Sequence, residues 1–218
     1  ASTNQLGSYQ LYPADNTYPV ILIVSSGAGC ADTLEQQIEI YPVPIAEFTF
    51  DSVCFPLEIQ FTDLSEPNGN YAISSWIWTF SDGQTSAVQY PNVDFGMPGT
   101  FSAELLISNG PGCKSTFIDG DAVVHPLPIA DFPTGLAACL EDTIFFTEES
   151  NITPVTDDLI TNWDWNFDDG SSSVLVEPNH LYTNHNLYDV QLTVTTNHSC
   201  TDEMTNVVEI SPYQVSTS

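Results

Sequence analysis

The sequence almost lacks basic side chains. Its 218 residues contain one Lys or Arg, Lys114, against 29 Asp and Glu, and the formal net charge is −28. Proteins that bind nucleic acid neutralise phosphates with Lys and Arg, so this composition excludes nucleic acid as a partner. It also excludes a polybasic membrane anchor. The longest apolar run, residues 19–24, is far too short to cross a bilayer, so we expect no direct membrane insertion.

Sequence motifs for common chemistries are absent as well. The glycine-rich phosphate loops of nucleotide enzymes do not occur. No CxxC pair or Cys/His cluster indicates zinc, and no Ser or Cys has a His and an acid to activate it. Asp157 and Asp158 could imitate an acid–base pair, but adjacent acids on a strand point to opposite faces. We predict that the chain is not an enzyme and that calcium is the one cofactor to consider.

What the sequence does contain is an internal repeat. Three segments place an aromatic residue, a second aromatic six residues later and a Cys twelve residues after that. They are Tyr12, Tyr18 and Cys30; Phe95, Phe101 and Cys113; Tyr182, Tyr188 and Cys200. A second set recurs twice, with Pro-x-Pro-Ile-Ala-x-Phe at 42–48 and 126–132, and Trp-x-Trp-x-Phe-x-Asp-Gly at 76–83 and 163–170. The three cysteines are 83 and 87 residues apart, which sets the length of the repeat.

The repeat predicts how the chain is divided. The Pro-Ile-Ala segments begin a unit and the aromatic–Cys segments end one, so residues 44–127 and 128–212 are two complete units. Residues 1–43 then form the C-terminal half of a unit, and residues 213–218 form a linker to a following domain. We interpret the chain as a piece of a longer tandem array. The alternative is a degenerate first domain that lends its strands to a neighbour.

Each unit has the pattern of an all-β sandwich. Apolar residues are 42% of the chain, enough for a packed core, and they alternate with period two. The alternating segments are 18–24, 57–61, 76–80, 101–107 and 188–194. Ser-Asp-Gly at 81–83 and Asp-Asp-Gly at 168–170 supply turns. Because the Pro-x-Pro junctions are short and stiff, we expect the β-sandwiches to be arranged end to end as a rod.

The five cysteines suggest disulfides within the units. In each complete unit one Cys precedes an early strand and one follows a late strand. If those strands are antiparallel, both cysteines lie at the same end of the sandwich. We therefore predict Cys54–Cys113 and Cys139–Cys200, with Cys30 bonded to a Cys upstream. The alternative is five free thiols in a reducing compartment.

The last unit resembles the PKD domain. Trp-Asn-Phe-Asp-Asp-Gly at 165–170, Glu-Pro-Asn-His-Leu-Tyr at 177–182 and the alternating strand at 188–194 are similar to that family's motifs. The middle unit is similar at 78–83 and 90–101, and departures are Ser81 and Asp168 in place of Gly and Val93 in place of His. The resemblance implies immunoglobulin-like sandwiches, which are usually extracellular.

The cysteines, the junctions and the tandem layout resemble long cell-surface proteins of Bacteroidota. Those proteins are often exported by the type 9 secretion system and include gliding-motility adhesins. The resemblance implies a structural or adhesive repeat segment at the cell surface. Its partners would be neighbouring repeats of the same polypeptide, and surface glycans or other cell-surface proteins. The alternative is an accessory binding or spacer module of a secreted glycan- or protein-degrading enzyme.

Two further kinds of site are predicted. Calcium prefers carboxylate and carbonyl oxygens, and some PKD-type domains bind it near a junction. The candidates are Glu47, Asp131, Asp168 and Asp169. The alternative is that these acids serve only solubility and repulsion between neighbours. The Asp-Ser/Thr-apolar pattern of Bacteroidota O-glycosylation occurs at Thr33, Ser52 and Thr143.

Overall fold

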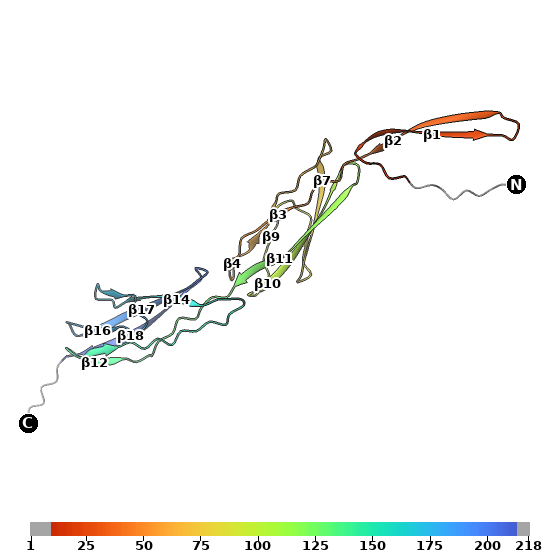
Figure 1. Ribbon diagram of the computed structural model, residues 1–218. Coiled ribbons are helices and arrows are strands. Elements are labelled where there is room, and N and C mark those ends of the chain that lie inside the picture. The colour runs from red at the N-terminus through yellow and green to blue at the C-terminus, as the bar shows by residue number, and fades with distance from the viewer. Residues whose placement is uncertain (1–9, 213–218) are drawn as a thin grey trace, which may run out of the picture. The chain divides into compact units, whose positions relative to one another are not determined.

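The computed structural model describes residues 10–212, and every regular element in that range is a β-strand (Figure 1). The all-β prediction is therefore confirmed, while the linker predicted at 213–218 lies outside the described residues. The chain forms two compact units. The first holds the chain up to Thr49, then Thr62–Pro91 and Ala103–Asp119. The second holds Phe50–Phe61, Asn92–Ser102 and the chain from Gly120, so it combines part of the middle repeat with the last repeat.

The first repeat segment is a single long hairpin. Strands β1 (Asn16–Ser25) and β2 (Ala31–Ile40) pair antiparallel as a two-stranded sheet of their own. Its alternating residues Val20, Leu22 and Val24 are 37, 57 and 60% exposed. The corresponding Val190 and Leu192 of the last repeat are fully buried. The hairpin thus carries core-type residues on an exposed face, and no other strand of the described chain pairs with it.

The middle repeat contains a five-stranded sheet and two short strand pairs. The sheet has the order β4-β11-β10-β7-β8. Its strands are β4 (Val53–Cys54), β11 (Lys114–His125), β10 (Gly99–Asn109), β7 (Ile73–Phe80) and β8 (Thr85–Ser86). The short pairs are β3 (Phe48–Thr49) with β6 (Thr62–Asp63), and β5 (Ile59–Gln60) with β9 (Asn92–Val93).

The five-stranded sheet of the last repeat has the same topology. Its order is β12-β18-β17-β14-β15, and a separate pair is formed by two short strands. The sheet strands are β12 (Ala137–Cys139), β18 (Thr201–Ser211), β17 (Asn186–Thr196), β14 (Ile160–Asn166) and β15 (Ser172–Ser173). The pair is β13 (Thr143–Phe145) with β16 (Asn179–Leu181). In both repeats the first strand of the sheet is an edge strand that runs parallel to its neighbour, as β4 does to β11 and β12 to β18.

The core of the last repeat follows the predicted alternation. Trp165 is fully buried and packs edge to face against Phe132, with ring centroids 5.1 Å apart. Its Nε1–H donates to the carbonyl of Leu175, as Trp78 Nε1–H donates to that of Val88. Buried indoles need such a partner. The other buried core residues are Ala130, Ile144, Phe146, Phe167, Tyr182, Tyr188, Val190, Leu192, Val194, Val208 and Ile210.

In the turn after β14, a residue that departs from the family pattern takes a backbone conformation that favours Gly. Asp168 has φ of +61°, in the left-handed region that favours Gly. Ser81 is not among the described residues with positive φ. Asp168 is held there by its own hydrogen bonds. Its N–H donates to Asn166 Oδ1, and its Oδ2 accepts from the N–H of Asp189.

Candidate functional site

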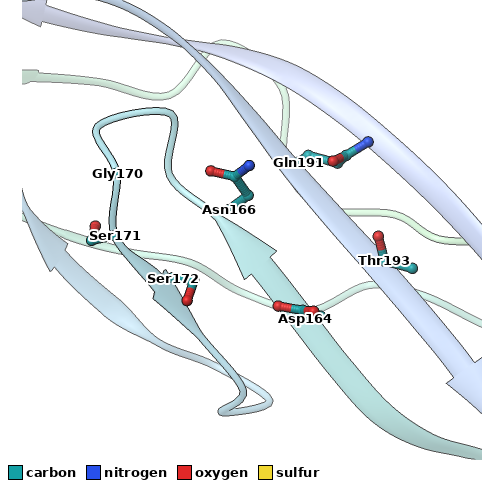
Figure 2. A pocket seen from close by; sticks show the side chains of 7 residues that line it. All are labelled: Asp164, Asn166, Gly170, Ser171, Ser172, Gln191 and Thr193. Atoms are coloured by element: carbon teal, nitrogen blue, oxygen red, sulfur yellow. The ribbon is translucent and has the colours of Figure 1, made fainter.

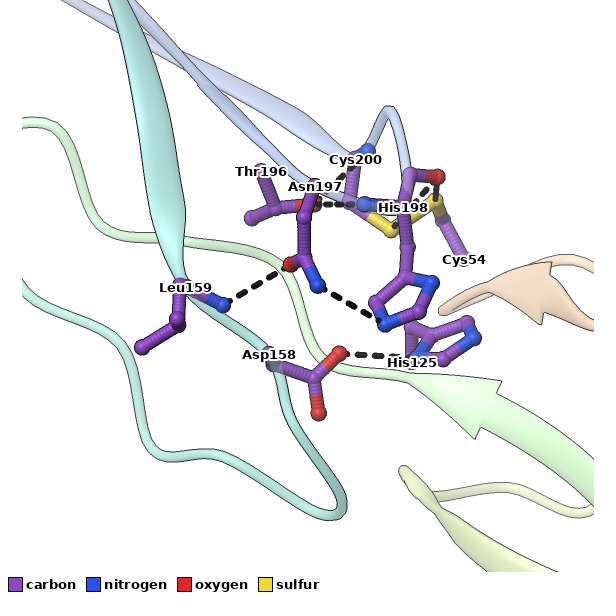
Figure 3. Close-up of a disulfide and its surroundings, with 8 residues drawn as sticks. All are labelled: Cys54, His125, Asp158, Leu159, Thr196, Asn197, His198 and Cys200. Atoms are coloured by element: carbon purple, nitrogen blue, oxygen red, sulfur yellow. Dashed lines mark hydrogen bonds and ion pairs between the residues drawn. A yellow bond between two sulfur atoms is a disulfide. The ribbon is translucent and has the colours of Figure 1, made fainter.

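A disulfide joins Cys54 and Cys200, whose Cα atoms are 5.6 Å apart and which are separated by 146 residues in sequence (Figure 3). Cys54 belongs to the middle repeat and Cys200 to the last, so the bond crosses the boundary between two repeats. The predicted bonds Cys54–Cys113 and Cys139–Cys200 are both contradicted, because each would use a cysteine that is already bonded. Cys30, Cys113 and Cys139 are free, and the upstream partner predicted for Cys30 stays a prediction.

The edge strands explain why the predicted pairing is wrong. The prediction placed each first Cys before an early strand, but Cys139 is the last residue of the edge strand β12 and lies opposite Ser211, the last residue of β18. Cys200 directly precedes the first residue of that strand. Since β18 has 11 residues, its ends are about 35 Å apart, whereas a disulfide spans Cα atoms only about 6 Å apart. The middle repeat has the same register, with Cys54 opposite His125 at the end of β11.

A buried ion pair lies beside the disulfide (Figure 3). His125 Nδ1 is 2.7 Å from Asp158 Oδ1, and both residues are buried. Asp158 Oδ2 accepts hydrogen bonds from the N–H groups of Val155 and Thr156. Burial of the carboxyl group is the largest influence and opposes ionisation, but these N–H groups and His125 together outweigh it. The pKa of Asp158 therefore lies below its ordinary value of 3.8.

A second imidazole completes the cluster. His198 lies two residues before Cys200, and its ring stacks on that of His125 with centroids 3.8 Å apart. Its Nε2 is 2.9 Å from Asp157 Oδ1, and this contact lowers the pKa of that exposed carboxyl. The two sulfur atoms of the disulfide lie 3.9 and 4.0 Å from the backbone oxygen of His198. Residues from two repeats thus form one cluster, which we call the boundary cluster: Cys54, His125, Asp157, Asp158, His198 and Cys200.

The boundary cluster also contains the one group of three possible metal ligands found within residues 10–212. The ligand atoms of His125, Asp158 and His198 all lie within 4.8 Å of one another. An imidazole binds a metal through a lone pair in its ring plane. The two rings are only 13° from parallel, so one ion cannot lie in both planes unless a ring rotates. In this arrangement the geometry favours hydrogen-bonded pairs over a metal centre.

The acids proposed for calcium lie in two kinds of place. Glu47 and Asp131 occupy equivalent positions after the junctions, where their carbonyl oxygens accept from the N–H groups of Leu64 and Glu149. Asp168 and Asp169 lie in the turn after β14. Asp169 Oδ2 is 2.8 Å from His180 Nε2. Across the described part of the chain none of these acids belongs to a group of three possible ligands, and calcium binding stays a prediction.

A shallow polar hollow of about 460 Å³ lies on the last repeat (Figure 2). Alternation along β14 and β17 turns Trp165 and Leu192 into the core and their neighbours outward. The outward side chains offer carboxylate, amide and hydroxyl groups, which can hydrogen-bond a polar ligand. The lining residues are Asp164, Asn166, Gly170, Ser171, Ser172, Gln191 and Thr193. This set holds no His or Cys that could act as a base or nucleophile.

The predicted O-glycosylation residues are all accessible. Thr33 lies on β2, Ser52 precedes β4 and Thr143 begins β13. Each is exposed. Accessibility is necessary for modification, and the modification itself stays a prediction.

Most of the boundary cluster has no signal in the sequence that points to a shared site. His125 lies in a junction, directly before Pro126, and a single His there indicates no role by itself. Asp158 stood out only as a neighbour of Asp157, and His198 has no counterpart in the middle repeat, where Pro111 holds its position. The repeat does show two recurring cysteine positions, one at Cys54 and Cys139 and one at Cys30, Cys113 and Cys200. Their recurrence is equally compatible with a bond between units, such as Cys54–Cys200.

Comparison with known proteins identifies the family. The family model of the PKD domain matches residues 41–124 and again residues 126–211. The chain belongs to the PKD domain family. Because the match occurs twice, it is a tandem of PKD domains.

Solved structures show the immunoglobulin-like fold of the PKD chain. It is similar to the three N-terminal domains of the Highly Immunogenic Outer Capsid protein of bacteriophage RB49, with a TM-score of 0.54 and 6% identity over 95% of this chain and 92% of that one. The PKD1 domain of the Vibrio cholerae metalloprotease PrtV matches with 24% identity and a TM-score of 0.34, over 38% of this chain and 98% of that domain. The PKD1 domain of Vibrio anguillarum Epp matches with 20% identity and a TM-score of 0.35, over 39% of this chain and 96% of that domain.

Membership of the PKD family bears on function and location. PKD domains are typically non-catalytic modules, and the comparisons show no catalytic family. PKD domains and a disulfide are both typical of extracellular proteins. In residues 10–212 there is no helix long and apolar enough to span a membrane. The PKD tandem is thus a repeat array of the kind used as an extracellular adhesive or spacer module.

Proposed function

We propose that this PKD tandem is a structural and adhesive segment of a long secreted surface protein, of the gliding-adhesin type exported by the type 9 system. The observation that carries the proposal is the Cys54–Cys200 bond between successive repeats. A bond within a domain protects that domain alone. A bond between repeats adds a second covalent connection to the peptide junction, which is useful where a chain is pulled along its length.

The bond determines how the chain would carry a pulling force. Force applied to the two ends passes through Cys54 and Cys200, which are 146 positions apart, and bypasses the chain between them. At ~3.5 Å per extended residue, about 500 Å of chain is protected from extension. Most of both sandwiches lies within the protected loop. We infer that the array resists lengthening even when its domains unfold.

The surface chemistry supports a role outside the cell. One basic side chain against 29 acids keeps the surface from binding polyanions. We place the domain boundaries at 44–127 and 128–212, with short Pro-containing junctions that limit bending. Neighbouring repeats are then the first partners. For a surface glycan, the polar hollow of the last repeat is the contact we propose, since its hydroxyl, amide and carboxylate groups suit sugar hydroxyls.

Single-molecule force spectroscopy of the 218-residue chain, held at its two ends, tests the mechanical role. We expect unfolding with reductant to release about 500 Å more contour length than unfolding without it. The variant Cys139→Ser is a matched control, because Cys139 is free and its loss should leave both values unchanged. Equal contour lengths with and without reductant would refute the mechanical proposal.

The mass of the natural polypeptide, measured with and without reductant, tests the wider setting. A mass many times 23.8 kDa with further PKD repeats is expected for the surface protein. A hydrolase domain on the same polypeptide would instead favour an accessory role beside an enzyme. Labelling of intact cells with an antibody against the chain tests the surface location, and labelling only after lysis would contradict it.

A further inference from the structure

We infer that the Cys54–Cys200 bond is one member of a series that links every repeat to the next. In this series Cys113 bonds to the counterpart of Cys54 in a preceding repeat, and Cys139 bonds to the counterpart of Cys200 in a following repeat. The inference rests on the proposed function, because it requires further repeats on both sides. The bonding partner of Cys113 and of Cys139 is then a cysteine of another copy of this PKD repeat.

Cys139 has the same local structure as the bonded Cys54. Each lies on the parallel edge strand, opposite the last residue of the long strand, with Cys54 opposite His125 and Cys139 opposite Ser211. The next residue in each case donates its N–H to that partner's carbonyl, as Phe55 does to His125 and Leu140 to Ser211. A turn closes on each Cys carbonyl, with N–H groups donated by Leu57 and by Asp142. Cys139 is exposed and is therefore accessible to a partner.

Cys113 has the same local structure as the bonded Cys200. Each ends the tight turn between the two long strands of its repeat. The turn is closed by an N–H from the residue four positions earlier to the Cys carbonyl, from Asn109 to Cys113 and from Thr196 to Cys200. The side chain of that same residue accepts from the Cys N–H, through Asn109 Oδ1 in one turn and Thr196 Oγ1 in the other. The turn at Cys30 repeats the backbone bonds, with Ser26 as donor.

The position of Cys113 supplies an independent observation. Its Sγ lies 3.9 Å from the backbone oxygen of Tyr41. Tyr41 directly precedes Pro42, as His125 directly precedes Pro126, so the two residues are equivalent. His125 is the residue beside which Cys54 lies. The Cys113 thiol is therefore placed next to the strand end at which the partner cysteine of a preceding repeat would lie.

The series accounts for each free cysteine in the complete repeats. Cys113 and Cys139 are unpaired in the chain because each is half of a bond whose other half belongs to an adjacent repeat. Formation of each bond converts two thiols to one disulfide, releasing two protons and two electrons. A disulfide-containing oxidant takes the electrons by thiol–disulfide exchange and becomes a dithiol. The Cys54–Cys200 bond requires the same oxidant.

Disulfide mapping of the natural polypeptide tests the series. Free thiols are alkylated before denaturation, the protein is digested without reductant, and linked peptides are identified by mass spectrometry. We expect the Cys139 peptide linked to a peptide with a turn Cys of a following repeat, and the Cys113 peptide linked to an edge-strand Cys of a preceding one. The Cys54–Cys200 peptide in the same digest is the positive control.

The outcomes separate this inference from the proposed function. Alkylated Cys113 or Cys139 in a polypeptide with many repeats would overturn the series and leave the surface protein standing. An intact mass near 23.8 kDa would overturn both. Absence of the Cys54–Cys200 peptide would overturn the series at its first member, and a bond from Cys139 to any Cys other than the turn type would do the same.

Discussion

The imidazole of His125, at the end of β11, stacks on that of His198 in the turn before Cys200, with centroids 3.8 Å apart. The junction before the middle repeat holds a related pair of rings. Tyr41 and Tyr71 meet edge to face at 5.1 Å and donate to the two oxygens of Glu39. Each junction therefore combines two rings with a carboxylate. The rings are stacked in one junction and edge to face in the other.

Loss of the disulfide should destabilise the chain by up to about 5 kcal/mol, the chain-entropy value for a loop of this length. The double variant Cys54→Ser/Cys200→Ser removes the bond without leaving a lone thiol. Urea denaturation should show unfolding of the two repeats separating into distinct transitions. Cys139→Ser, at the equivalent edge-strand position but unbonded, should match the wild type. An equal loss of free energy of unfolding in the double variant and in Cys139→Ser would contradict the structural role of the bond.

Acid should weaken the buried His125–Asp158 pair. The pKa of Asp158 is lower in the folded chain than its ordinary value of 3.8, so the unfolded state binds the proton more readily. The stabilisation is present above pH 3.8 and is lost as the pH falls through the lower folded value. At neutral pH Asp158→Asn should cost roughly 2 kcal/mol, because a charge-assisted hydrogen bond is lost.

Urea midpoints measured between neutral pH and about pH 3 test this pH dependence. The difference in urea midpoint between the wild type and Asp158→Asn should become smaller as the pH falls. Asp157→Asn removes the exposed partner of His198 and should change stability little at any pH. A wild type–Asp158→Asn difference that stays constant with pH would show that the carboxylate charge has no part in stabilising the junction.

Replacement of Ser199 by Gly should stabilise the folded chain. Ser199 has φ of +64°, whereas the equivalent positions hold Gly29 and Gly112 with φ of +84° and +92°. A left-handed conformation costs a residue with a side chain about 1 kcal/mol. Ser199→Gly should therefore raise the free energy of unfolding by up to ~1 kcal/mol, measured by urea denaturation. Gly112→Ser is the reverse control. Its new Cβ meets nothing within 4 Å, so any loss reports on the backbone alone.

Glu148→Asp should give Trp163 a hydrogen-bond partner. Trp163 Nε1 is buried and makes no hydrogen bond to the described chain, whereas the equivalent Trp76 Nε1–H donates to Asp63 Oδ2 at 2.7 Å. Glu148 holds the position of Asp63, since both accept from the N–H of a Ser two residues on. We expect a gain of roughly 1–2 kcal/mol in the free energy of unfolding. A loss of stability would mean that the shorter carboxylate does not reach the indole.

Leu22 and Leu192 should respond differently to the same change. They are equivalent in the repeat, but Leu192 is fully buried and Leu22 is 57% exposed. Leu192→Ala should cost about 2–5 kcal/mol, because it leaves a cavity. Leu22→Ala should change the free energy of unfolding by less than about 0.5 kcal/mol. A comparable loss in Leu22→Ala would reveal that another surface covers the hairpin in solution.

The sequence predicts the parts of the structure that depend on local pattern. Alternation identified the long strands, and Trp165 and Leu192 lie in the core as expected, because side-chain direction in a strand depends only on neighbours. The disulfide depended on the partner of a very short edge strand. Strand β4 has two residues, too few for any periodic signal, and its parallel pairing with β11 decided where Cys54 lies. The contact of His125 with His198 joins two repeats, and no pattern within one repeat contains it.

The loop closed by Cys54 and Cys200 also changes what a protease can achieve. A secreted chain meets proteases, and exposed turns such as the one at Gly170 are the usual places for a cut. One cut anywhere between the bonded cysteines, which are 146 positions apart, leaves both fragments attached to each other. The molecule is nicked but not severed, and whatever it holds stays connected. A single cut severs the chain only at a site that no such loop encloses.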